Sequence, residues 1–255
     1  MNASGPVDLA RPAWGYALMA VSPARLSQGC YPELSTPTPM HSTAIRTFFI
    51  DGLAGRLESI LNAGSGTATH AALVCHPHPL FGGTLHNKVV FHAMKALHGF
   101  GFPVLRFNFR GAGLSEGEHG RGDDEVDDVR TALDWLDHEF HLPLIFAGFS
   151  FGAAVGLRAA CPDERVKAVI GLGTPVVAVD NRHYDLGFLQ NCTKPKLFVS
   201  GALDQYGPSA QVEKLVAPLP PPKRLVIIAG GDHFFEGRLK EMREEIEKWL
   251  LESLM

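Results

Sequence analysis

The chain has 255 residues, of which 45% are hydrophobic and 20% are charged, and its formal net charge is −4. This length and composition predict one domain with a substantial core. The negative charge and the lack of a basic run argue against a nucleic-acid partner. No segment approaches the roughly 20 apolar residues that a membrane span needs, so no membrane partner is expected.

Residues 1–42 differ from the rest of the chain. They are rich in Pro, Ser and Ala and lack the strand and helix patterns seen later, so we interpret them as a disordered extension, with Met40 as an alternative true start. Export is a further alternative because the segment around Cys30 has a faint likeness to a lipoprotein cleavage site, although Gly15 breaks the preceding apolar run. The cysteines show neither metal nor redox spacing, which predicts a reduced, cytoplasmic setting: Cys30, Cys75, Cys161 and Cys192.

Short apolar runs alternate with helical patterns across residues 43–255, which we predict to be the folded domain. The predicted strands are 44–50 and 57–61, paired across Asp51-Gly52, then 71–75, 104–108, 144–147, 166–170, 196–200 and 224–229. The predicted helices are 88–98, 125–138, 153–160, 209–216 and 238–251. This alternation predicts an α/β fold, with a mostly parallel sheet of about eight strands, helices on both faces and sites at the carboxyl ends of the strands.

The loop after the third predicted strand, residues 76–83, reads His-Pro-His-Pro-Leu-Phe-Gly-Gly. Where a sheet of this kind carries a nucleophile elbow, this loop supplies one backbone N–H to an oxyanion hole. Pro77 and Pro79 have no N–H to donate. We therefore expect the donor to be His78, with Leu80 as the alternative.

Two pentapeptides fit the pattern Gly-x-Ser-x-Gly. The first, centred on Ser115, runs into a polar, glycine-rich loop with no helix after it. The second, centred on Ser150, lies between an apolar run and a small-residue helical stretch, which is the strand-turn-helix setting of a nucleophile elbow. The sequence predicts Ser150 as the nucleophile, with the N–H of Phe151 at the helix start as an oxyanion donor.

A serine nucleophile needs a base and a carboxylate that orients the base. Asp204 follows the seventh predicted strand and His233 follows the eighth, in the expected order after Ser150. Asp232 is a rival acid, but neighbours in sequence seldom have the freedom to make the required hydrogen bond. The remaining alternatives for the acid are Asp180 and Asp185.

The segment between the strands at 166–170 and 196–200 is short, polar and loop-like, which leaves little room for a lid. We expect an open cleft whose apolar walls come from residues near the site. The alternative, which is the commoner case for any single phenylalanine, is that the side chain belongs to the core. The candidates are Leu80, Phe81, Phe149, Phe151, Phe188 and Phe234.

Four motifs together resemble the small, lidless bacterial α/β-hydrolases related to dienelactone hydrolase, over about residues 43–252. They are His76 to Gly83 with Asn87-Lys88-Val89-Val90, Asn108 to Ser115, Gly148 to Gly152, and Asp232 to Phe235. The resemblance implies ester or thioester hydrolysis without a cofactor, and places Ser115 in a turn after the fourth strand. The acid loop departs from the pattern: it reads Gly-Ala-Leu-Asp, where such proteins often have an extra acidic residue after the glycine.

These features predict a serine hydrolase acting on a small-molecule ester or thioester. A serine peptidase on the same triad is one alternative, because fold and triad do not fix the acyl group. A non-catalytic binding module with this scaffold is another. His76, His78 and His86 suggest a zinc-dependent hydrolase, but no acidic ligand is near them and two prolines stiffen the loop, so no metal is predicted.

Overall fold

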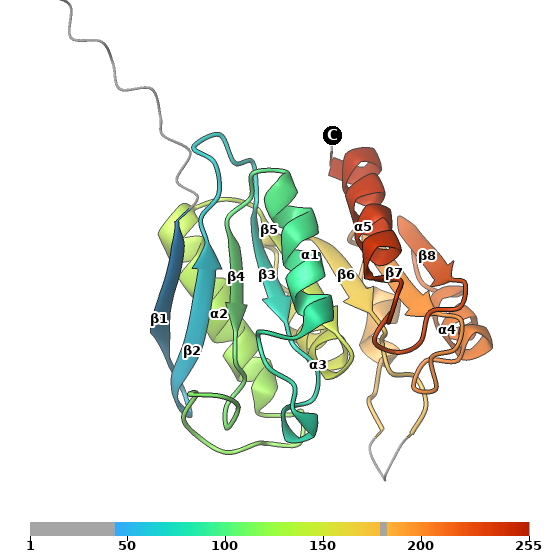
Figure 1. The fold of residues 1–255 in the computed structure, drawn as a ribbon, viewed down its shortest axis with the longest axis horizontal. Helices are drawn as coiled ribbons and strands as arrows, with labels where there is room; N and C mark the ends of the chain where they lie inside the picture. Colours follow the sequence, from blue (N-terminus) through green and yellow to red (C-terminus); the bar gives the residue numbers. More distant parts are fainter. Residues whose placement is uncertain (1–43, 179–182, 255) are drawn as a thin grey trace, which may run out of the picture. The chain divides into compact units, whose positions relative to one another are not determined.

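The computed structural model describes residues 44–178 and 183–254, and its centre is an eight-stranded sheet (Figure 1). The strand order is β1-β2-β4-β3-β5-β6-β7-β8. The β1–β2 and β2–β4 pairs are antiparallel, and every other pair is parallel. The strands are β1 Ile45–Gly52, β2 Gly55–Asn62, β3 Ala71–Cys75, β4 Val104–Phe107, β5 Leu144–Phe149, β6 Val166–Leu172, β7 Lys196–Gly201 and β8 Lys223–Ile228.

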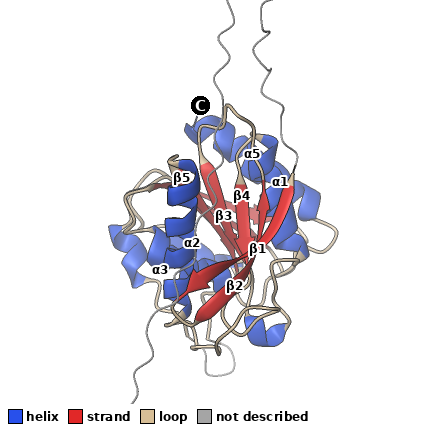
Figure 2. Cartoon of the chain, turned by 90° about the vertical axis from the view of Figure 1, so that its left-hand side faces the viewer, coloured by secondary structure: helices blue, strands red, loops and turns tan. Residues whose placement is uncertain are grey.

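Helices cover both faces of the sheet (Figure 2). They are α1 Lys88–Gly99, α2 Glu125–Phe140, α3 Phe151–Ala160, α4 Ser209–Val216 and α5 Leu239–Leu254. Side chains alternate between faces along a strand: Leu73 of β3 packs in the core cluster with α2 and α3, and Val74 packs in the cluster with α1 and α5. The predicted α/β-hydrolase fold, with its mostly parallel eight-stranded sheet, is therefore confirmed.

Two details differ from the sequence prediction. The opening hairpin turns at Leu53 and Ala54 instead of at Asp51-Gly52, because the strands stay paired as far as Gly52 and Gly55. The predicted loops at 76–83 and 171–195 each contain a short 3-10 helix, Pro79–Phe81 and Gly187–Asn191.

The predictions for residues 1–42, including a start at Met40, lie outside the described residues. Within the described ranges, no helix is long and apolar enough to cross a bilayer.

The parallel part of the sheet determines where the site lies. Strands β3, β5, β7 and β8 run in the same direction, so the loops that follow them leave the sheet at one edge. All the predicted catalytic residues lie on these loops. Such an edge is where open α/β sheets place their ligands.

Candidate active site

Ser150 forms the turn between β5 and α3. It is the single residue between Phe149, the last of the strand, and Phe151, the first of the helix. Its backbone has φ 53° and ψ −118°, a region that costs a non-glycine residue energy and that clusters at functional sites. A Cβ on Gly152 would lie 2.5 Å from the carbonyl oxygen of His76, and one on Gly148 would collide with the carbonyl oxygen of Gly152. The glycines are therefore required by close backbone approach.

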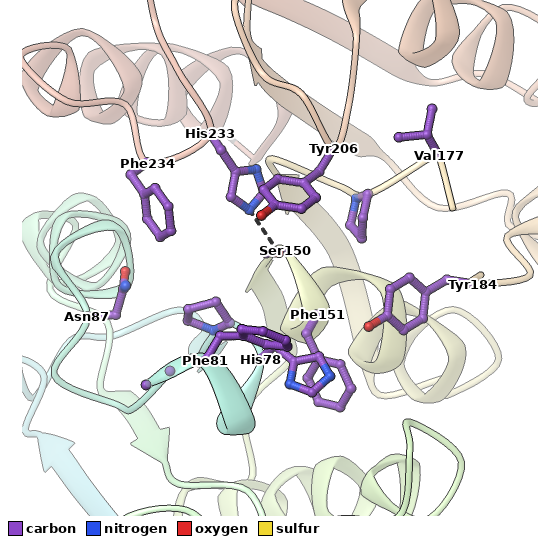
Figure 3. A pocket seen from close by; sticks show the side chains of 14 residues that line it. His78, Phe81, Asn87, Ser150, Phe151, Val177, Tyr184, Tyr206, His233 and Phe234 are labelled. Carbon is purple, nitrogen blue, oxygen red and sulfur yellow. Dashed lines mark hydrogen bonds between the residues drawn. The ribbon is translucent and has the colours of Figure 1, made fainter. Parts of the chain in front are cut away.

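A hydrogen-bonded chain joins the three predicted catalytic side chains. Figure 3 shows its Ser150–His233 part. The Ser150 Oγ lies 2.9 Å from the His233 Nε2, and the His233 Nδ1 lies 2.9 Å from the Asp204 Oδ2. His233 is 4% exposed and Asp204 is 2% exposed. This arrangement fixes the imidazole with Nδ1 toward the carboxylate and Nε2 toward the serine, as a general base requires.

The loop that carries Asp204 holds the carboxylate in place. The Oδ1 atom accepts hydrogen bonds from the backbone N–H groups of Tyr206 (2.8 Å) and Gly207 (3.1 Å), which leaves Oδ2 for the histidine. Backbone donors of this kind compensate the burial of a charged carboxylate.

Two of the three alternative acids make other hydrogen bonds. Asp232 accepts the N–H groups of Phe234 and Glu236, at 3.0 and 2.9 Å, so it closes the turn after the histidine. Asp185 accepts the N–H of Gly187 at 2.8 Å. Asp180 lies outside the described residues.

The two loops expected to form an oxyanion hole lie against each other. Phe151 is the first residue of α3, so its N–H has no acceptor within the helix. The N–H of Leu80 donates to the His78 Nδ1 at 3.2 Å, which argues against Leu80 as the second donor. The N–H groups of Phe81 and Gly83 both donate to the carbonyl of His78. His78 is therefore the candidate backbone donor of this loop.

A cavity of about 150 Å³ opens beside the serine. Figure 3 shows the side chains that line it, drawn from the loops after β3, β5, β6, β7 and β8. The lining residues are Pro77, His78, Phe81, Gly82, Gly83, Asn87, Ser150, Phe151, Pro175, Val177, Tyr184, Tyr206, His233 and Phe234. The predicted walls Phe81, Phe151 and Phe234 are among them.

Three predicted wall residues do not line this cavity. Phe149 is fully buried, and its ring packs against the His233 ring on the core side, with 5.0 Å between ring centroids. Phe188 lies on the 3-10 helix at Gly187–Asn191 and lines a separate hollow with Arg121 and Arg158, because that connection folds away from the serine. The side chain of Leu80 is exposed to solvent.

Sequence reasoning missed the tyrosines of the cavity. Tyr206 lies two residues after the proposed acid, in the short loop that follows β7. This closeness to Asp204 was the signal that could have identified it. Its ring centroid is 4.5 Å from that of His233. Tyr184 gave no signal, since it belongs to a long connection without a motif.

Ser115 and His76 have structural surroundings. The Ser115 hydroxyl donates to the carbonyl of Asn108 (2.7 Å) and accepts the N–H of Glu58 (2.9 Å), so it ties the turn to β2.

His76 is fully buried and uses both ring nitrogens: Nε2 accepts the N–H of Phe109 at 2.9 Å, and Nδ1 donates to the carbonyl of Pro77 at 2.6 Å. Neither nitrogen is open to a metal ion, which removes His76 from the zinc set considered above.

The burial of His76 also changes its protonation. Loss of solvation lowers its pKa from 6.5 to about 4, so the ring is neutral near pH 7.

The chain matches a protein family and is similar to several known proteins. Residues 73–252 match the model of an alpha/beta hydrolase domain family. An alpha-beta serine hydrolase homologue from Coxiella burnetii is 36% identical, with a TM-score of 0.73 over 80% of this chain and 96% of that one. A serine hydrolase without a lid from Xanthomonas campestris is 30% identical, with a TM-score of 0.73 over 84% and 97%. An uncharacterized protein of Rickettsia prowazekii is 33% identical over 80% of this chain and 87% of its own length.

Proposed function

Since the chain belongs to the alpha/beta hydrolase domain family, we propose that it is a serine hydrolase that cleaves small carboxylic esters and thioesters through Ser150, His233 and Asp204. The hydrogen-bonded chain between these side chains is the observation that carries the proposal. A hydroxyl 2.9 Å from an imidazole nitrogen, itself 2.9 Å from a buried carboxylate, has the contacts that activate a serine.

Acylation begins when the His233 Nε2 takes the proton of Ser150 and the Oγ attacks the carbonyl carbon. The carbonyl electron pair moves to oxygen, and the backbone N–H groups of Phe151 and His78 stabilise the oxyanion that forms. When the carbonyl re-forms, the bond to the leaving group breaks and the imidazolium returns its proton to the alcohol or thiol that departs. An acyl ester on Ser150 remains.

Deacylation repeats the sequence with water. His233 takes a proton from a water molecule, whose oxygen attacks the acyl carbon, and the second tetrahedral species collapses with return of the proton to the Ser150 Oγ. The carboxylic acid leaves and the free serine is restored. Asp204 remains ionised throughout and stabilises the imidazolium in both halves of the reaction.

A fluorophosphonate probe and a substrate panel test the proposal together. We expect the probe to label Ser150, and the enzyme to hydrolyse short acyl esters and thioesters faster than a peptide amide. Ser150→Ala should abolish labelling and reduce kcat by at least about 10⁴-fold.

Ser115→Ala is the matched control, because it removes a hydroxyl from the other Gly-x-Ser-x-Gly segment. It should retain labelling and most turnover, with a stability loss of about 1–2 kcal/mol from its two hydrogen bonds. Absence of any adduct in the wild type would favour a binding module without chemistry, and preferential cleavage of the amide would favour a peptidase.

A further inference from the structure

Two large apolar side chains stand exposed at the cavity beside Ser150. Phe81 is 67% exposed and Phe234 is 50% exposed, and both line the cavity. Figure 3 shows them approaching it from separate loops. Exposed aromatic rings around a hollow are typical of a surface that a ligand covers.

Neighbouring rings fix the orientation of both phenylalanines. The Phe81 ring meets the His78 ring edge-on, with centroids 5.0 Å apart and an interplanar angle of 77°. The Phe234 ring meets His233 at 5.2 Å and 81°, and Phe149 at 5.8 Å and 70°. Edge-to-face contact is a preferred geometry of aromatic pairs. These contacts restrict the rings, so a ligand that packs on them incurs a smaller loss of side-chain entropy than on rings without neighbours.

The rest of the lining is also aromatic. Seven of the fourteen lining residues carry an aromatic or imidazole ring, and Val177 is the single branched aliphatic side chain among the described residues that line the cavity. Ring surfaces favour a planar aromatic ligand over a saturated one of similar size, because ring pairs gain stacking or edge contact beyond simple burial.

The cavity volume sets the size of the group that it accepts. A space of about 150 Å³ is comparable to protein cavities that hold one benzene molecule. It therefore matches the size of a single six-membered ring.

We propose that this cavity selects esters that carry one aromatic ring within one or two bonds of the scissile ester group, seated against Phe81 and Phe234. The proposal rests on the serine hydrolase function above and specifies its substrate class. The ring belongs to either the acid or the alcohol part of the ester, and matched substrates distinguish these two sources.

The test compares kcat/KM for planar and saturated pairs. Methyl phenylacetate against methyl cyclohexylacetate probes the acid part, and benzyl acetate against cyclohexylmethyl acetate probes the alcohol part. We expect the aromatic member to be preferred by about tenfold in one of the pairs. Phe81→Leu and Phe234→Leu should each lower the preference severalfold, by slowing the aromatic ester more than the saturated ester.

Phe91→Leu is the control, because Phe91 is an exposed phenylalanine of α1 that does not line the cavity. It should leave the preference unaltered. Equal rates within twofold for both wild-type pairs, or a preference that survives both cavity substitutions, would overturn the proposal. If the enzyme hydrolyses methyl butyrate but shows no preference for the aromatic member of either pair, the proposed substrate class is rejected and the serine hydrolase function is retained. If no ester is hydrolysed and Ser150 is not labelled, the serine hydrolase function fails and the substrate class fails with it.

Discussion

The ring of Tyr206 packs against the imidazole of His233 in a tilted arrangement, with 4.5 Å between ring centroids and an interplanar angle of 58°. Tyr206 also donates its backbone N–H to Asp204 and lines the cavity. One residue therefore touches both the proposed base and the proposed acid. Its backbone contact does not depend on the side chain, so substitution can separate the two roles.

We expect the Tyr206 ring to stabilise the imidazolium that forms as Ser150 attacks. An aromatic face near a cation is worth about 1–2 kcal/mol at a partly desolvated site. Tyr206→Leu should therefore lower kcat and the rate of fluorophosphonate labelling by about tenfold. Tyr206→Phe, which keeps the ring, should restore most of both rates. If Leu and Phe variants behaved alike, the ring would have no such role.

The tight turn around Ser150 leads to a second prediction, on the effect of replacing Gly152. A Cβ on Gly152 would press on the backbone where β3 ends, 2.5 Å from the His76 carbonyl oxygen. Backbone cannot move aside easily, so Gly152→Ala should lose about 1–3 kcal/mol of unfolding free energy in urea and also lose activity.

Gly99→Ala provides the matched control, since this glycine ends α1 and its Cβ would meet nothing within 4 Å. It should be neutral or slightly stabilising. Equal effects of the two substitutions would show that the close approach at Gly152 does not constrain the turn.

A buried ion pair fixes the chain after β4. The Arg110 guanidinium contacts the Asp128 carboxylate at 2.8 and 3.1 Å, and the Arg110 N–H donates to the same carboxylate at 3.0 Å. Asp128 is fully buried. Asp128→Asn removes the buried carboxylate that contacts the guanidinium and leaves only more distant ones, so we expect a loss of about 3–5 kcal/mol in urea unfolding.

Asp124 offers the comparison within the same ion-pair network. Its carboxylate lies 3.8 Å from Arg110 and is largely exposed. Asp124→Asn should therefore cost less than about 1 kcal/mol. A small effect at both positions would mean that burial adds nothing to the Arg110–Asp128 pair.

The sequence was sufficient to predict the sheet and the loops that carry the proposed triad. Apolar runs followed by glycines indicated that Ser150, Asp204 and His233 each come just after a strand. Because these strands are parallel, their carboxyl ends lie at the same edge of the sheet, which brings the three residues together. The cavity walls were harder to predict. Phe149 precedes the serine, yet it lies in the core beneath His233, and Tyr206 lines the cavity because of how its loop closes on Asp204. The direction in which each of these side chains points depends on the backbone conformation of its loop, which a short sequence motif does not specify.

His76 should make the stability of the fold depend on pH. Burial lowers its pKa in the folded protein to about 4, whereas the unfolded chain has the ordinary value of 6.5. Between these values the unfolded state binds a proton that the folded state does not, so the unfolding free energy falls as pH decreases through this range. From pH 7 to pH 5 the expected contribution of this one residue is a loss of about 2 kcal/mol.

Urea unfolding at both pH values tests this contribution in a His76→Gln variant. The variant starts from lower stability, but its loss from pH 7 to pH 5 should be smaller than that of the wild type by about 2 kcal/mol. His86→Gln, which removes an exposed imidazole from the same part of the chain, should keep the wild-type pH dependence. Parallel pH profiles for the wild type and His76→Gln would contradict a neutral, buried His76, because a ring that titrates equally in both states cannot make folding depend on pH.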